Sequence, residues 1–329
     1  MNPQDRSAAR LAFVQRHLSA DVSSMTPASA DASFRSYWRV RNGASSIVVM
    51  DAPPDKEPIA PWLDIGARLR AKGLHAPEVF ASDAQLGFVL MEDLGERIYL
   101  PELNATSADA LYADALAALE RMQAVDTAGL PVYDRAQLVM ELELMPEWFL
   151  RRHLGCVPNC EEWDVIEAAF THLVHAALEQ PACFVHRDYH SRNLLIAERN
   201  NPAVIDFQGA MHGPLTYDLA SLLRDCYIAW PDARVDAWVE ASRQRIAAAV
   251  DTTTFRRWFD LTGLQRHIKV LGIFCRLHHR DGKPGYLGDL PRVFAYVVDV
   301  ARRHPALLDF SELLQRIAGN RDLAAAATP

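Results

Sequence analysis

Hydrophobic and polar positions follow two different periods along this chain. From Phe34 to Arg41 and from Ser46 to Met50 they alternate, as in half-buried strands, and the dipeptide Asn42-Gly43 lies between the two runs. Because Asn-Gly favours the tight turn of a hairpin, these segments predict a pair of antiparallel strands. Apolar spacing predicts two more strands and two helices nearby: strands over Pro77–Phe80 and Phe88–Met91, and helices over residues 3–19 and 60–72, the second ending at Gly73.

Helical periodicity dominates the rest of the chain. Ser107 precedes a run of apolar residues spaced along one helix face, which predicts a capped helix from Ser107 to Ala124. Four more helices are predicted over Leu219–Trp230, Val235–Val250, Phe255–His278 and Pro291–Ala301. The expected fold class is α+β, with a small antiparallel-sheet lobe over residues 1–93 and a mostly helical lobe over residues 94–329.

One short hairpin is expected inside the helical lobe. Leu194–Ile196 and Ala203–Ile205 are apolar runs separated by a polar turn that ends in Pro202. Two antiparallel strands bring the residue before the first strand beside the residue after the second, and these residues are Asn193 and Asp206. Each offers a hard oxygen, the kind of ligand that Mg²⁺ takes from proteins while it keeps waters and phosphate oxygens.

A third candidate site residue, Asp188, stands five positions before Asn193. Asp188 is expected to face that metal across a cleft, where a carboxylate can orient an acceptor hydroxyl and accept its proton. Together with His186 and Asp218, this layout is typical of a phosphoryl-transfer site. A competing interpretation treats His186, Asp188 and His190 as the metal-binding cluster of a hydrolase. That interpretation leaves Asn193 and the later carboxylates unexplained.

The residues from His186 to Asn193 read His-x-Asp-x-x-x-x-Asn, and Ile205-Asp206-Phe207 follows. This pattern resembles the aminoglycoside phosphotransferase and choline kinase family, whose members share the bilobal fold of protein kinases. The resemblance implies ATP as the phosphoryl donor and Mg²⁺ as the metal. It assigns roles to five residues: Asp188 as catalytic base and acceptor contact, Asn193 and Asp206 as magnesium ligands, and His186 and Asp218 as structural braces of the catalytic loop.

The same resemblance implies where the nucleotide base binds. In this family, the linker between the lobes binds the adenine edge of ATP through backbone groups, and Glu92, Asp93 and Leu94 lie at that place here. Backbone recognition leaves almost no side-chain signature. The alternative, an ordinary strand that ends in a turn, therefore stays open.

Two parts of the expected phosphate site are altered. The loop over residues 30–36 has no glycine, so Ser33 and Ser36 would offer hydroxyls instead. The strand Ile47–Asp51 lacks the Lys that normally pairs with the α and β phosphates, and Met50 falls near its place. Three cations nearby in the sequence could neutralise these phosphates instead: Arg39, Arg41 and Lys56. Alternatively, phosphate binding rests on the magnesium ion alone, held in part by Asn193. The departure also permits a catalytically inactive relative that only binds a nucleotide or a partner, although the base and both metal ligands are retained.

The acceptor site is expected in the helical lobe. Residues 264–292 carry six Lys and Arg against two Asp, so six minus two gives a charge of +4 in a chain of net −8. This excess favours a neutral or anionic acceptor, because Arg matches carboxylates and a cationic acceptor would need acids or an aromatic cage. The alternative is that these cations are solvated or pair with Glu141, Glu143 and Glu147.

Three segments, Met50–Pro54, Glu143–Phe149 and Ile268–Leu277, resemble one bacterial subgroup of the family. That subgroup phosphorylates the anomeric hydroxyl of N-acetylmuramate and N-acetylglucosamine during the recycling of cell-wall peptidoglycan. The resemblance implies a sugar 1-kinase in which the missing Lys is a subgroup trait. A kinase for an aminoglycoside, choline or another small hydroxyl compound is the alternative. The acceptor contacts proposed on this basis, besides Asp188, are Glu143, Trp148, Lys269 and Arg276.

Composition sets the remaining expectations. With 329 residues, 50% hydrophobic and 23% charged, the chain has a globular composition and no apolar run long enough to cross a membrane. The first residues lack the order of a secretory signal, and five Cys predict reduced thiols in the cytoplasm. A net charge of −8 argues against nucleic acid as a partner. No membrane association or obligate protein partner is predicted.

Overall fold

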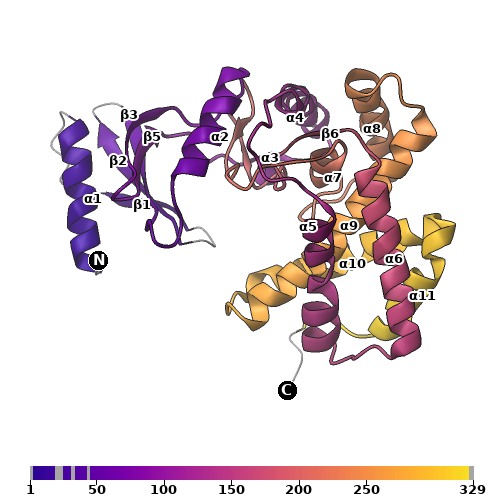
Figure 1. The fold of residues 1–329 in the computed structure, drawn as a ribbon. Coiled ribbons are helices and arrows are strands. Elements are labelled where there is room, and N and C mark those ends of the chain that lie inside the picture. Colours follow the sequence, from indigo (N-terminus) through magenta and orange to yellow (C-terminus); the bar gives the residue numbers. More distant parts are fainter. Residues whose placement is uncertain (1–2, 19–24, 31–33, 43–44, 326–329) are drawn as a thin grey trace. The chain divides into compact units, whose positions relative to one another are not determined.

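The computed structural model describes residues 3–18, 25–30, 34–42 and 45–325 (Figure 1). The described chain divides into two compact units. The first unit contains the residues up to Arg121 together with Arg192–Gly209, and the second contains Met122–Ser191 together with the residues from Ala210 onward. In this division, residues 94–121 and the hairpin over 192–209 fall in the same unit as the N-terminal sheet. The predicted boundary between the two lobes after residue 93 stays a prediction.

The first unit is built on a five-stranded sheet in the order β1-β2-β3-β5-β4, with every neighbouring pair antiparallel. Its strands are β1 Thr26–Ala30, β2 Ser36–Asn42, β3 Ser45–Asp51, β4 Val79–Asp83 and β5 Phe88–Glu92. The hairpin predicted around Asn42-Gly43 is confirmed, because β2 and β3 pair from Ser36 opposite Asp51 to Asn42 opposite Ser45. The predicted strands at β4 and β5 are confirmed as well, whereas β1 carried no clear apolar pattern and was not predicted.

Four helices belong to the N-terminal region: α1 Pro3–His17, α2 Ala60–Ala71, α3 Tyr99–Glu102 and α4 Ala108–Gln123. Helix α1 packs on the sheet through a small core that joins Phe13 and Val14 to Val49 and Phe88. Helix α2 ends before Gly73, as predicted, and that glycine has a φ of 72°, a conformation that favours residues without a Cβ.

The predicted short hairpin is present as β7 Leu194–Leu195 and β8 Ala203–Val204, with Leu194 opposite Val204. Backbone hydrogen bonds tie the hairpin to the first unit. The Val204 N–H donates to the His75 carbonyl at 2.8 Å, and the Ile196 N–H donates to the Arg97 carbonyl at 2.7 Å. These bonds are the physical reason why residues 192–209 belong with the first unit.

The second unit is mostly helical. Its elements are α5 Arg135–Leu142, the π-helix η1 Met145–His153, α6 Cys160–Leu178, β6 Ala182–Val185, β9 Met211–Pro214, α7 Tyr217–Leu223, α8 Asp232–Ile246, α9 Thr252–His279, the 3₁₀-helix η2 Pro284–Asp289, α10 Leu290–Arg303, the 3₁₀-helix η3 Pro305–Leu307 and α11 Leu308–Ala318. The predicted helices at α8, α9 and α10 are confirmed, while the antiparallel pair β6–β9 was not predicted.

The predicted helix over Leu219–Trp230 is wrong in its second half. Helix α7 ends at Leu223, and Asp225 then accepts a hydrogen bond from the Tyr227 N–H at 2.9 Å. A short acidic side chain that bonds the backbone two residues ahead competes with helical hydrogen bonding. Apolar periodicity alone does not reveal this competition.

Helix α9 is the central element of the second unit, and most of its residues are buried. Gly272 marks its closest approach to another element. A Cβ at this position would lie 2.4 Å from the backbone carbon of Leu144, at the start of η1. The helix can therefore pack against η1 only because residue 272 has no side chain.

No helix in the described part of the chain is long and apolar enough to cross a membrane. All five cysteines lie in the described part and are free thiols.

Candidate active site

The loop that carries Asp188 lies between β6 and β7. Asp218 of α7 holds it by hydrogen bonds. Both carboxylate oxygens of Asp218 accept backbone hydrogen bonds, from the N–H of His186 at 2.6 Å and from the N–H of Arg187 at 2.9 Å. Burial raises the pKa of Asp218 to about 6. Arg187 has a φ of 78°, which is unusual for a residue with a side chain and is a form of strain that concentrates at functional sites.

Asp188 itself is half-buried, and its environment keeps it ionised. Burial on its own raises the pKa of the Asp188 carboxyl, but the positive charges of Lys269 and Arg266 outweigh that effect and the net shift is downward. Arg266 and Lys269 are three residues apart on α9 and so lie on the same side of the helix. An ionised carboxylate can accept a hydrogen bond from a hydroxyl, as a base that orients an acceptor must.

The two histidines of this loop do not form a metal site. The imidazole of His186 is fully buried, and its Nδ1 accepts a hydrogen bond from the Asp188 N–H at 3.3 Å. Burial lowers the pKa of His190, which contacts the ring of Tyr227. No group of three or more His, Cys, Asp or Glu suited to a metal ion occurs among the described residues. The competing hydrolase interpretation therefore finds no support in the structure.

A second brace of the loop was not foreseen from the sequence. Asp225 accepts hydrogen bonds from both the N–H and the hydroxyl of Ser191, at 2.9 and 2.5 Å. Arg266, which is 3% exposed, lies next to it and donates to the Cys226 sulfur at 3.2 Å. The only sequence signal was charged residues inside an otherwise apolar stretch of α9, a pattern that indicates buried and partnered charges.

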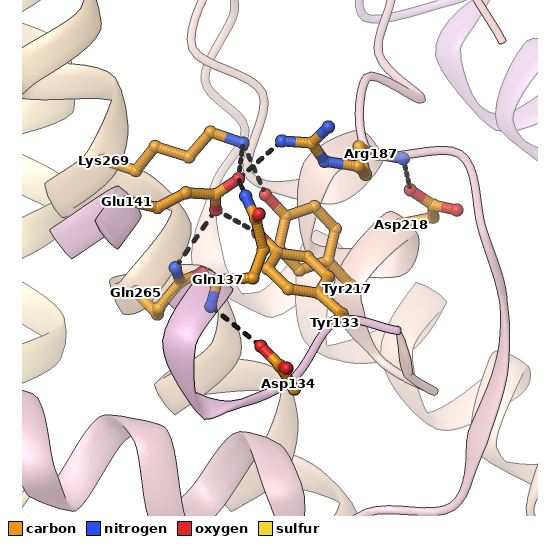
Figure 2. A network of polar contacts seen from close by, with 9 residues as sticks. All are labelled: Tyr133, Asp134, Gln137, Glu141, Arg187, Tyr217, Asp218, Gln265 and Lys269. Carbon is orange, nitrogen blue, oxygen red and sulfur yellow. Dashed lines mark hydrogen bonds and ion pairs between the residues drawn. The ribbon is translucent and has the colours of Figure 1, made fainter. Parts of the chain in front are cut away.

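A buried polar network surrounds Glu141 of α5 and includes Arg187 of the loop (Figure 2). Glu141 is 3% exposed and accepts from Arg187 Nη2 at 2.5 Å, and its Oε1 lies 3.2 Å from Lys269 Nζ. Lys269 also donates to the hydroxyl of Tyr217 at 3.1 Å. Three further donors complete the set around the carboxylate: Tyr133, Gln137 and Gln265. The network thus links α5 and α9 to the residue directly before Asp188.

In the first unit, the hairpin brings Asn193 and Asp206 together as predicted. The Ile205 N–H donates to the Asn193 carbonyl at 3.1 Å, so the residue that follows Ile205 lies beside Asn193. Asp206 has a φ of 64°, and its Oδ1 accepts from Gln208 Nε2 at 2.8 Å. Arg35 Nη2 lies 3.4 Å from the same oxygen. One amide and one partly exposed carboxylate form an oxygen donor set that fits Mg²⁺, which completes its octahedron with water and phosphate oxygens.

The side chains of the predicted linker are engaged with their own unit. Asp93 accepts from Arg39 Nε at 2.5 Å, from the Ser46 hydroxyl at 2.6 Å and from the Gly95 N–H at 3.0 Å. Glu92 contacts the ring of His75 at 3.0 Å, and Leu94 is half-buried. These contacts fix the shape of the turn after β5. The predicted adenine contacts through the backbone of this segment stay a prediction.

Comparison with known protein families identifies the family of this chain. Residues 24–258 match the family described as "Phosphotransferase enzyme family". The chain belongs to the phosphotransferase enzyme family. This match spans the N-terminal sheet, the hairpin and the loop of Asp188, and it confirms the family that the loop and hairpin motifs had indicated.

Curated relatives and solved structures agree with the family assignment. The phosphotransferase is 47% identical over 296 residues to an N-acetylmuramate/N-acetylglucosamine kinase of Pseudomonas aeruginosa, covering 88% of this chain and 87% of that one. It is 38% identical to a protein of the same name from Neisseria meningitidis, covering 91% and 92%. Two solved structures share its fold at a TM-score of 0.62: ADP-bound aminoglycoside phosphotransferase APH(2″)-Ib, at 15% identity with 89% and 98% coverage, and choline kinase LicA of Streptococcus pneumoniae, at 12% identity with 90% and 99% coverage. The predicted protein-kinase-like fold is confirmed.

The residues predicted to contact the acceptor lie in different surroundings within the second unit of the phosphotransferase. Glu143 is exposed at the end of α5, in a shallow depression beside Met140. Trp148 is half-buried on η1, with the guanidinium of Arg152 over its ring at 5.6 Å. Ser33, predicted to contact the phosphates, lies outside the described residues.

The cations of residues 264–292 do not form a single charged surface. Arg266 and Lys269 are buried, and Arg280 and Arg292 pair with the nearby acids Asp281 and Asp289. Arg276 differs from these, because its buried Nε makes no hydrogen bond within the described part of the chain. It lies seven residues after Lys269, which places it on the same side of α9 about 10 Å further along.

Proposed function

We propose that this phosphotransferase is an ATP-dependent sugar kinase that transfers the γ-phosphoryl group to the anomeric hydroxyl of N-acetylmuramate and N-acetylglucosamine. Its place would be the recycling of peptidoglycan sugars in the cytoplasm, without nucleic acid, membrane or an obligate protein partner. The sugar acceptors are proposed from the names of relatives at 38–47% identity over most of both chains. The phosphoryl chemistry is proposed from the site residues.

The observation that carries the chemistry is the half-buried Asp188, whose pKa is lowered by nearby cations and whose two preceding residues donate their N–H groups to Asp218. The Asp188 carboxylate would accept a hydrogen bond from the sugar hydroxyl and take up the proton as the oxygen attacks. Asn193 and Asp206 would hold Mg²⁺ through the two oxygen donors that the hairpin brings side by side. When bound, Mg²⁺ neutralises negative charge on the β and γ phosphates.

An inactive nucleotide-binding relative is the second candidate, because the strand Lys is absent. The retained braces of the loop disfavour it. Asp218 holds two N–H groups, and Asp225 holds Ser191. These bonds fix the backbone on both sides of Asp188, which is the arrangement that a catalytic base requires.

The decisive experiment incubates the protein with ATP, Mg²⁺ and N-acetylmuramate and locates the phosphate in the product by ³¹P and ¹³C NMR. We expect phosphate on the anomeric carbon. Asp188→Asn should lower kcat by roughly 10²- to 10⁴-fold, and Asp206→Asn should abolish Mg²⁺-dependent turnover. Asp164→Asn, at an exposed position on α6, is the matched control and should leave kcat unchanged.

Three outcomes would contradict the proposal. Phosphate on another hydroxyl would refute the anomeric assignment, and turnover only with choline or an aminoglycoside would refute the sugar assignment. ATP binding without turnover of any acceptor would favour the inactive relative.

A further inference from the structure

The strand position where a phosphate-binding Lys is expected is closed to ligands in this protein. Met50 is fully buried in β3, opposite Tyr37 on one side and Val89 on the other. Its neighbour Asp51 is also buried and pairs with Arg6 and Arg10 of α1. A cation that serves the nucleotide phosphates must therefore come from another element of this unit.

The cations suggested by sequence proximity have other surroundings. Arg39 pairs with Asp93 and Glu96 at the turn after β5, and these contacts raise the pKa of its guanidinium. Arg41 is exposed on β2. Lys56 is also exposed, and its ammonium lies 5.9 Å from the ring centre of Phe34. No hydrogen bond or ion pair in the described structure brings any of these three cations to Asp206.

Arg35 is different because it reaches the hairpin. It stands directly before β2, and its side chain is 8% exposed. Its Nε lies 3.0 Å from Glu57 Oε2, and its Nη2 lies 3.4 Å from Asp206 Oδ1. The guanidinium is thus held between one acid of the sheet unit and the carboxylate at the open end of the β7–β8 hairpin.

We propose that Arg35 is the residue that binds the phosphates of the nucleotide, in place of the missing strand Lys. This inference rests on the proposed function as a nucleotide-dependent kinase. A guanidinium has five donors in a planar fork that matches phosphate oxygens, and it stays charged at every physiological pH. Glu57 positions the fork from one side. The contact to Asp206 is long for a charge-assisted hydrogen bond, and phosphate oxygens replace it when the nucleotide binds.

Equilibrium binding without any acceptor tests this role. Arg35→Gln should raise the Kd for ATP by about 10- to 100-fold, the range expected when hydrogen bonds to a charged group are lost. The loss should persist in EDTA, because Arg35 would contact the phosphates directly and not through the metal. Binding of adenosine, followed by ligand-observed NMR, should change less than about twofold. Arg35→Lys should keep part of the affinity, since it retains the charge but not the fork.

The control variant is Arg16→Gln, at an exposed position on α1 in the same unit. It should bind both ligands as the unchanged protein does. Unchanged ATP affinity in Arg35→Gln, or an equal loss for adenosine and ATP, would overturn the assignment of Arg35 and leave the proposed function standing. Failure of the unchanged protein to bind ATP at all would overturn both.

Discussion

Glu141 is the residue whose replacement tests the buried network most directly. Its carboxylate lies between Lys269 and Arg187, and Lys269 is only 6% exposed. Glu141→Gln keeps the side-chain volume and one acceptor oxygen but removes the negative charge. Because the ammonium of Lys269 would then be buried without a counter-charge from α5, the change should be strongly destabilising.

The size of the effect follows from this burial. Removing one partner of a buried ion pair costs about 3–5 kcal/mol. Gln can still accept a hydrogen bond from Tyr133, so we expect the lower end, about 3 kcal/mol. For a chain of 329 residues each kcal/mol lowers Tm by about 1.5 °C, so Tm should fall by about 4–5 °C. Differential scanning calorimetry at pH 7 measures the shift. Glu143→Gln, two residues further along and exposed, should change stability by less than about 0.5 kcal/mol.

The pH dependence of this loss separates charge from packing. Acids now raise the pKa of Lys269 despite its burial. In Glu141→Gln, burial should instead place the pKa of Lys269 in the folded state below its value in the unfolded state. At pH values between these two pKa values, the unfolded chain then binds more protons than the folded chain. Stability of the variant therefore rises with pH in that window, and the Tm gap should narrow from pH 7 to about pH 9.5.

A second change provides the rescue. Lys269→Met added to Glu141→Gln removes the uncompensated charge and should recover at least half of the lost stability, because apolar replacement of a buried ion pair is often tolerated. Equal Tm values for Glu141→Gln and Glu143→Gln would refute the reasoning. A Tm gap that stays constant with pH would refute its electrostatic basis.

Three further predictions follow from single contacts. Gly272→Ala should lower Tm, because its Cβ would meet the Leu144 backbone. Gly285→Ala should leave Tm unchanged, because a Cβ there would point into open space. Calorimetry of both variants measures the difference. As pH falls through about 6, Asp218 takes up a proton and loses an acceptor for the loop N–H groups, so kcat should drop. Because the pKa of Asp218 is raised, its contribution to stability is largest below about pH 4 and is lost as pH rises through 6. Asp218 should therefore not lower Tm between pH 7 and 5.5, and a fall in Tm that accompanies the fall in kcat would contradict this explanation. Arg276→Ala should raise KM for N-acetylmuramate about 10-fold more than KM for N-acetylglucosamine, because the Arg276 guanidinium would bind the carboxylate that only N-acetylmuramate carries. Equal changes in the two KM values would argue against that contact. Arg280→Ala, at a residue that pairs with Asp281, is the control.

Local features of the sequence were sufficient to predict the elements that carry the candidate site. The order of Asp188, Asn193 and Asp206 along the chain, with a short hairpin between the last two, is a matter of neighbours within some twenty residues. Turn chemistry at Asn42-Gly43 and helix termination at Gly73 are equally local. Such signals need no knowledge of what packs against them, and the structure confirms the pairing of β2 with β3, the β7–β8 hairpin and the end of α2.

Contacts between distant segments could not be predicted in this way. Arg35 and Asp206 are 171 positions apart, and Glu141 and Lys269 are 128 apart (269 minus 141). Lys269 was predicted to contact the acceptor, with pairing to Glu141 as one alternative, and the fold buries it beside Glu141 of α5. Helix α7 ended early for a similar reason, because Asp225 bonds Tyr227 and Ser191 instead of continuing the helix.

The sequence by itself determined which residue types stand at the proposed catalytic positions and that the motif of a phosphotransferase is present, because spacing along a strand or loop fixes which side chains are neighbours. Only the tertiary structure decided which charges are paired, which cation reaches the hairpin and which Lys is buried. A charge has no fixed role until the packing of remote elements sets its exposure and its partner, since the free energy of an ion depends on its surroundings far more than that of an apolar side chain.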